Sequence, residues 1–228
     1  MLIRHFLDVM HIEKNVSESV VGTTLNWEGK TKDGPKARLD LQNMGIREHL
    51  WLVEGMRKMP QAPYTVKPEQ KKLVFQWLKK ARYPSGFAGN ITRCVRQNNS
   101  LYGLKSHDHH IFLQRLFPVF IRPFLPRYVV EPLVALARFF QKLCTREVRR
   151  SDLLEMREHI ILIMCKFERI FPPNFFDIMP HLMIHLPEQL MLTGPVHFTW
   201  MYPMERYVCS TTSYMFPKFV YEYLNNVF

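Results

Sequence analysis

The segment from residue 152 to residue 170 constrains the fold of this chain more than any other. Apolar residues lie on nearly every side of a helix drawn through it, a pattern typical of a helix buried at the centre of a domain. Asp152 and Glu155 have capping-box spacing at its start, and the pair Pro172-Pro173 ends it. We therefore predict a domain built around this helix.

Most of the remaining chain also predicts helices, because apolar residues recur at intervals of three and four while strand signals are few. Pro68 suits the first position of a helix, where its missing amide hydrogen has no partner to lose. Ser106 suits an N-cap, with Asp108 in the first turn. The fold class is mainly α, an irregular multi-helix domain. The other predicted helices span residues 1–26, 47–58, 68–82, 106–118, 131–144 and 174–185, with a loop at 29–36 and irregular chain at 83–104.

Charge points to a class of partner. Lysine and arginine total 31 against 20 acidic residues, a net charge of +11, which favours nucleic acid first and an anionic surface second. A solvated basic surface explains the charge equally well. No segment has the roughly 18 uncharged apolar residues of a membrane helix, so no membrane partner is expected.

The cysteines form no C-x-x-C pair, so the spacing predicts neither a disulfide framework nor a zinc knuckle. Reduced thiols are expected, with Cys144 and Cys165 in the helical core.

Two groups of histidines could bind a metal. Asp177, His181 and His185 are four residues apart and would share one helix face, although Pro180 interrupts the segment and core histidines are the favoured interpretation. In the run 107–110, neighbouring residues point in different directions, so helix capping explains it better. We predict no metal site.

Two basic loops could bind DNA phosphates, or could equally be solvated surface. The predicted DNA-binding residues are Lys30, Lys32, Lys36, Arg38, Arg146, Arg149 and Arg150.

From residue 5 to residue 208 the chain resembles the CACTA (En/Spm-like) transposases of plant genomes, in matched stretches that occur in the same order. Among them are Leu7-Asp8-Val9-Met10-His11-Ile12-Glu13-Lys14-Asn15-Val16, Gly103-Leu104-Lys105-Ser106-His107-Asp108, Phe171-Pro172-Pro173-Asn174-Phe175-Phe176-Asp177 and Trp200-Met201-Tyr202-Pro203-Met204-Glu205-Arg206-Tyr207.

The resemblance implies DDE-type strand transfer, in which three carboxylates of an RNase H-like core hold two divalent metals. Related superfamilies carry a D/C-x-x-H signature after the second acid, and Asp8 with His11 looks like it. Glu205 falls where the third acid is expected. The family implies Mg²⁺, but the chain begins at the Asp8 motif and leaves the family pattern after Tyr207, so no cofactor is expected here.

We therefore expect a transposase fragment that catalyses nothing, a helical insertion with the core strands largely missing. It would be nuclear and could retain surfaces for DNA, self-association or a transposase partner. The alternatives are a domesticated DNA-binding or protein-interaction module, and an active metal-dependent nuclease. The expected parts are a transposase remnant at 1–60, a linker and helix at 61–104, a transposase-associated domain of unknown function at 105–208 and a divergent tail at 209–228.

Overall fold

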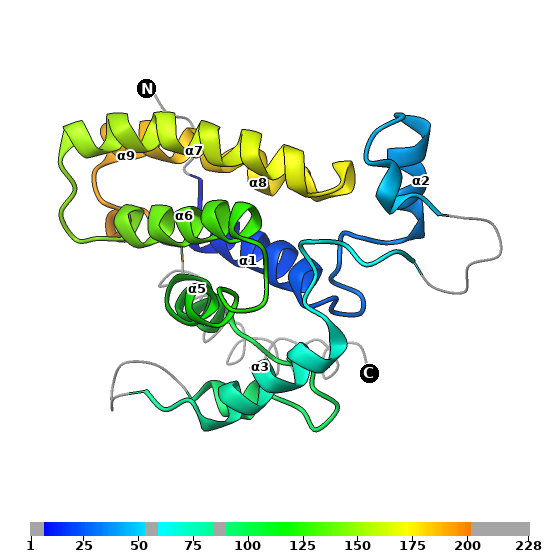
Figure 1. Ribbon diagram of the computed structural model, residues 1–228. Coiled ribbons are helices and arrows are strands. Elements are labelled where there is room, and N and C mark those ends of the chain that lie inside the picture. The colour runs from blue at the N-terminus through cyan, green and yellow to red at the C-terminus, as the bar shows by residue number, and fades with distance from the viewer. Residues whose placement is uncertain (1–6, 53–58, 84–89, 202–228) are drawn as a thin grey trace, which may run out of the picture.

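The computed structural model describes residues 7–52, 59–83 and 90–201, and this part of the chain is mainly helical, as predicted (Figure 1). Within it the backbone pairing of strand type is an isolated antiparallel bridge, Val95 to Leu101. No described helix combines the length and the apolar character that crossing a membrane requires. The helices are α1 (Val9–Thr24), α2 (Pro35–Asn43), α3 (Pro68–Lys80), α4 (Ser106–Ile111), α5 (Phe117–Phe120), α6 (Arg127–Leu143), α7 (Arg150–Ile170), α8 (Ile178–Leu182) and α9 (Leu186–Thr193). Short 3-10 turns lie at Glu48–Leu50, Ile91–Cys94, Pro173–Phe175, Met183–His185 and Val196–Phe198, and a π-helical turn, Phe112–Leu116, joins α4 to α5.

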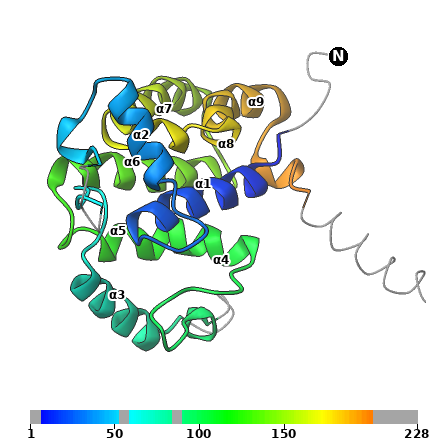
Figure 2. The same ribbon diagram turned by 90° about the vertical axis from the view of Figure 1, so that its right-hand side faces the viewer.

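Helix α1 lies at the centre of the molecule. Val9, Ile12, Val16 and Val20 are fully buried, since residues three and four apart share a helix face. Figures 1 and 2 show α4 and α5 on one side of α1, with α8 and α9 on the other. Buried apolar residues from Val9 to Val196 belong to one hydrophobic core, which includes those of α1.

Helix α7 is not the central helix, and this prediction is wrong. Its buried residues recur along one face, whereas Leu154, Ile161 and Leu162 are exposed on another. It packs against α6 and α9 at the outside of the domain (Figure 1). The apolar residues on nearly every side of this helix therefore do not mean that it is buried all round, because some of them form an exposed apolar face.

Helix starts follow the sequence signals in part. Pro68 is the first residue of α3, as predicted. The predicted caps of α4 and α7 are displaced, because Ser106 is itself helical and α7 begins two residues before Asp152. Asp108 instead accepts a hydrogen bond from the amide of Lys105 at 2.9 Å. Both acids still lie in a first turn, where the helix dipole favours negative charge.

The predicted helix over 174–185 is broken into a 3-10 turn, α8 and a second 3-10 turn. Asp177 starts α8 by accepting a hydrogen bond from the amide of Met179 at 3.0 Å. Of the predicted helix at 47–58, the structure shows a single 3-10 turn, and residues 53–58 lie outside the described part.

Arg47 ties the segment after α2 to the end of α7. Its guanidinium donates to the carbonyl oxygens of Ile170 at 3.1 Å and Phe171 at 2.8 Å, and also to that of Glu168. Carbonyls in the last turn of a helix have no partner within the helix, and the negative end of the helix dipole favours a cation there. The backbone of Arg47 has a φ of 54°, so these contacts hold a residue in a conformation that is strained for a side chain with a Cβ.

Candidate functional site

The residues predicted from the resemblance to be catalytic are Asp8, His11 and Glu205, and the structure describes the first two. Asp8 is the N-cap of α1, and its carboxylate accepts a hydrogen bond from the amide of Met10 at 3.1 Å. His11 is exposed, and Glu205 lies outside the described residues. Two-metal chemistry needs several carboxylates that converge on ions about 4 Å apart, and Asp8 belongs to no described group of three metal-ligand side chains. The described residues therefore do not fit a Mg²⁺ pair.

In the first predicted basic loop, residues 30–38, two of the lysines form ion pairs with acidic residues of the same chain. Lys30 pairs with Glu18 at 2.7 Å, and Lys32 pairs with Asp177 at 2.9 Å. Lys36 is exposed.

Arg38, in contrast, is 1% exposed. Its guanidinium donates to the carboxylate of Asp33 at 2.5 and 2.7 Å and to the carbonyl oxygen of Leu50 at 3.1 Å. A phosphate cannot reach it in this conformation, so Arg38 has a structural role and takes no part in the interface described below.

The second predicted basic loop connects α6 to α7 and is exposed. The side chains of Arg146, Arg149 and Arg150 are accessible to solvent and make no ion pair with a described acidic residue. The two basic loops lie at opposite ends of α7, since Asn174, just past its end, donates to Lys32. A helix of 21 residues is about 30 Å long, so the loops form separate patches.

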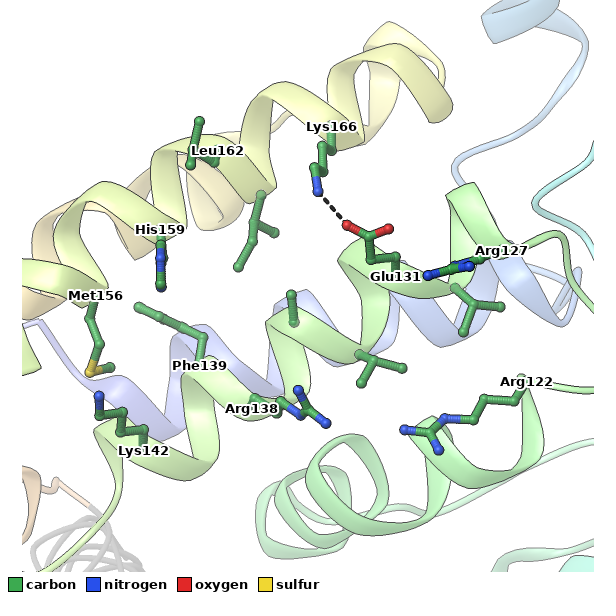
Figure 3. Close-up of a pocket in the computed structure, with 14 residues that line it drawn as sticks. Arg122, Arg127, Glu131, Arg138, Phe139, Lys142, Met156, His159, Leu162 and Lys166 are labelled. Carbon is green, nitrogen blue, oxygen red and sulfur yellow. Dashed lines mark hydrogen bonds and ion pairs between the residues drawn. The ribbon is translucent and has the colours of Figure 1, made fainter.

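A groove of about 600 Å³ lies along α6 and α7 beside this second loop (Figure 3). Its apolar lining includes Val130, Phe139 and Ile163. The rim carries five lysines and arginines against one acid, Glu131, which pairs with Lys166 at 2.6 Å. The basic rim residues are Arg122, Arg127, Arg138, Lys142 and Lys166.

Sequence reasoning missed this groove. A usable signal was the pair Arg138 and Lys142, which are four residues apart and so share one face of α6. What the sequence did not give was the position of α7, which supplies the opposite wall.

A second cluster lies between α1 and α4. Glu13 is 1% exposed, and its carboxylate contacts Nδ1 of His110 at 2.7 Å and accepts from Nε2 of Gln114 at 2.9 Å. One turn further along α1, Nδ1 of His109 lies 3.2 Å from the hydroxyl of Ser17. Burial lowers the pKa of His109 to about 4, so this histidine is neutral at pH 7.

The histidines of residues 107–110 therefore lie partly in this cluster, while the group at 177–185 behaves differently. His181 and His185 share a face as predicted, with their Nε2 atoms 3.3 Å apart. Both are exposed, so the interpretation as core histidines is wrong. Asp177 pairs with Lys32, and the three do not form a ligand group.

Residues 143–222 match the model of a protein family described as a domain of unknown function (DUF4218). No curated protein and no solved structure matches the chain. The matched region includes the arginine loop and the α7 wall of the groove, and it supports the expected presence of a helical domain of unknown function in this chain.

Proposed function

We propose that this chain is a nucleic-acid-binding part of a CACTA-type DNA transposase, and that the groove between α6 and α7, with the arginine loop beside it, binds the phosphate backbone. The ordered sequence resemblance and the family match over residues 143–222 support the origin. The net charge of +11 supports a polyanionic partner.

The observation that carries this proposal is a line of unpaired cations. Arg122 and Arg138 on the groove rim make no hydrogen bond or ion pair within the described residues, and neither do the three side chains of the arginine loop. From Arg127 to Arg138 the rim follows α6 for about 17 Å. Lys142, one turn further along α6, is instead paired with Asp152 at 3.6 Å and Glu155 at 3.5 Å. Duplex DNA carries one charge per about 1.7 Å of its axis, so this line can contact several phosphates together.

We infer no strand transfer by this part of the chain. The resemblance assigns that chemistry to three converging carboxylates. In the described residues Asp8 caps a helix instead, so the proposed role is to hold DNA.

The test is a fluorescence-anisotropy titration of a labelled duplex with the full chain at several salt concentrations, with and without Mg²⁺. One variant changes Arg146, Arg149 and Arg150 to Gln. Its matched control changes Lys72, Lys80 and Arg82, which are exposed in or near α3, to Gln and so removes the same charge. The loop variant should lower the slope of log K against log salt by about 3, since each phosphate contact contributes about 0.9.

The control should keep most of that slope, and the duplex should stay uncut in every sample. Equal losses in the two variants would show that only net charge matters and would refute the assigned surface. Absence of binding by a folded sample at low salt would refute the function. Mg²⁺-dependent cleavage would establish nuclease activity in its place.

A protein-interaction module is the second candidate, because the groove has an apolar floor and DNA backbone offers no apolar surface to fill it. Binding of an acidic amphipathic peptide, but not of duplex, would favour this function. Light scattering on the chain alone distinguishes self-association from either.

A further inference from the structure

Three side chains with metal-binding atoms meet inside the molecule from three different helices. Glu13 comes from α1, His110 from α4, and Cys144 is the C-cap of α6. A carboxylate oxygen, a ring nitrogen and the Sγ atom lie within 4.8 Å of one another. Glu13 is buried and the other two residues are half-buried.

The charge of Glu13 has little compensation from the protein. No described lysine or arginine pairs with this carboxylate, and its ionic contact is His110. A buried carboxylate is costly unless it is paired or coordinates a metal ion. A positive charge bound in this cluster would therefore be electrostatically favourable.

The contacts around His110 point the same way. Its Nδ1 lies 2.7 Å from an oxygen of Glu13 and 3.1 Å from Nε2 of Gln114. An oxygen requires that nitrogen to donate a hydrogen, whereas an amide nitrogen requires it to accept one. With Nδ1 donating to Glu13, its contact with Gln114 is a close approach of two nitrogens and not a hydrogen bond.

Gln114 lies in the π-helical turn Phe112–Leu116, directly after α4. Turns of this kind are frequent at functional sites. Gln114 donates to the other oxygen of Glu13 at 2.9 Å, the kind of outer contact that orients a carboxylate ligand.

We propose that Glu13, His110 and Cys144 form a Zn²⁺ site with a water molecule as the fourth ligand. One oxygen, one nitrogen and one sulfur donor suit Zn²⁺, and three protein ligands leave one position open. Mg²⁺ and Ca²⁺ prefer oxygen ligands alone. The proposal is independent of DNA binding.

The site requires a small local movement, a shift of the His110 ring proton from Nδ1 to Nε2 and the loss of the Cys144 thiol proton. Donors around a tetrahedral zinc lie roughly 3.3–3.7 Å apart, so Glu13 and His110 separate slightly as the ion replaces the hydrogen between them. Burial raises the pKa of the Cys144 thiol above its usual range, so zinc binds by displacing the thiol proton and binds more tightly as pH rises.

The test uses the full chain after removal of bound metal and a titration with Co²⁺ as the spectroscopic probe. We expect one equivalent to produce a thiolate-to-cobalt charge-transfer absorption. Cys144→Ser should abolish this absorption. The matched control is Cys165→Ser, since Cys165 is a free and exposed thiol on α7 and its loss should change nothing. This exposure also shows that the expected core position of Cys165 is wrong.

Glu13→Gln should lower the Co²⁺ affinity by at least about tenfold, the smallest effect usual for the loss of even an outer-shell contact. Zn²⁺ should raise the melting temperature of the parent chain and of Cys165→Ser but not of Cys144→Ser. His110→Gln replaces the serine variant if circular dichroism shows that Cys144→Ser is unfolded. A folded parent chain without the charge-transfer absorption, or an absorption retained in Cys144→Ser, would overturn the proposal.

Discussion

The segment after α1 and the groove between α6 and α7 each contain a close ion pair. One pair is buried and the other is exposed to solvent. Arg38 and Asp33 are 2.5 Å apart with side chains 1% and 7% exposed. Lys166 and Glu131 are 2.6 Å apart with side chains 51% and 57% exposed. The distance is nearly the same, and the surroundings differ completely.

This difference teaches that burial, not distance, decides what a charge does here. Removing one partner of a buried pair leaves the other without water or counter-charge. An exposed pair gains little, because water and salt screen it. The buried charge of Arg38 therefore holds the fold, whereas exposed charges on the groove rim, such as Arg122 and Arg138, remain available to a partner.

The largest expected effect is that of Arg38→Ala. It leaves the buried Asp33 carboxylate unpaired, and we expect a loss of about 3–5 kcal/mol in the free energy of unfolding. Urea denaturation measures it. Lys36→Ala, at an exposed position two residues away, should change stability by no more than about 0.5 kcal/mol. Similar losses in both variants would erase the contrast between the two regions.

The next effect is a dependence of stability on pH through His109. Its folded pKa of about 4 lies below the value of about 6.5 in an unfolded chain, so unfolding takes up a proton between these values. The contribution of neutral His109 to the free energy of unfolding is fully present above about pH 6.5. It is lost as the pH falls towards 4, by up to about 3 kcal/mol.

Thermal melts of the parent chain and of His109→Gln from pH 7.5 to pH 4.5 measure this effect. The parent should lose its stability advantage over the variant as the pH falls. Parallel curves would show that His109 carries none of the dependence. His181→Gln, at an exposed site, is the control and should follow the parent.

Arg47→Ala comes third. It removes a cation that donates to carbonyl oxygens at the end of α7, and hydrogen bonds to charged groups contribute about 1.5–3 kcal/mol. It also removes packing of the aliphatic stem. Compared with the parent chain, the variant should show a larger increase in amide hydrogen exchange in the last turn of α7 than in its first turn. Uniform acceleration along α7 would contradict a local capping role.

The smallest effect is expected for Glu131→Gln. The exposed pair with Lys166 is lost, and the unfolding midpoint should not change measurably. Affinity for duplex DNA should rise by about two- to fivefold, since a negative charge leaves the basic rim. A clear drop in stability would place this pair with the buried ones.

The helical fold class and the start of α3 followed from the sequence, because periodicity and proline act locally. The position of Asp8 at a helix start also has a local signal, an acid directly before a helical apolar pattern. Local signals were weaker at α7, where apolar residues also occur on the exposed side.

The candidate sites could not be predicted, because they depend on segments that are distant in the chain. Arg38 reads as one more cation of a basic loop until Leu50 and Asp33 enclose it. Nothing local in the sequence shows that Glu13 is buried, because its burial depends on α4 and the end of α6, which pack beside it. Likewise the groove needs two antiparallel helices to be placed side by side.

The first described residue, Leu7, is hydrogen-bonded to α9, and this contact bears on how the chain folds during synthesis. The amide of Leu7 donates to the side-chain oxygen of Gln189 at 2.7 Å, and the side-chain nitrogen of Gln189 donates back to the carbonyl oxygen of Leu7 at 3.0 Å. A ribosome adds about 5–20 residues per second, so roughly 10–40 s separate the synthesis of the two partners. During that interval α4 can already pack against α1, but the side of α1 that packs against α8 lacks its cover. Helix α1 can therefore be covered fully only after α8 and α9 have been synthesised, and until then part of its apolar face is open to chaperones that shield such segments.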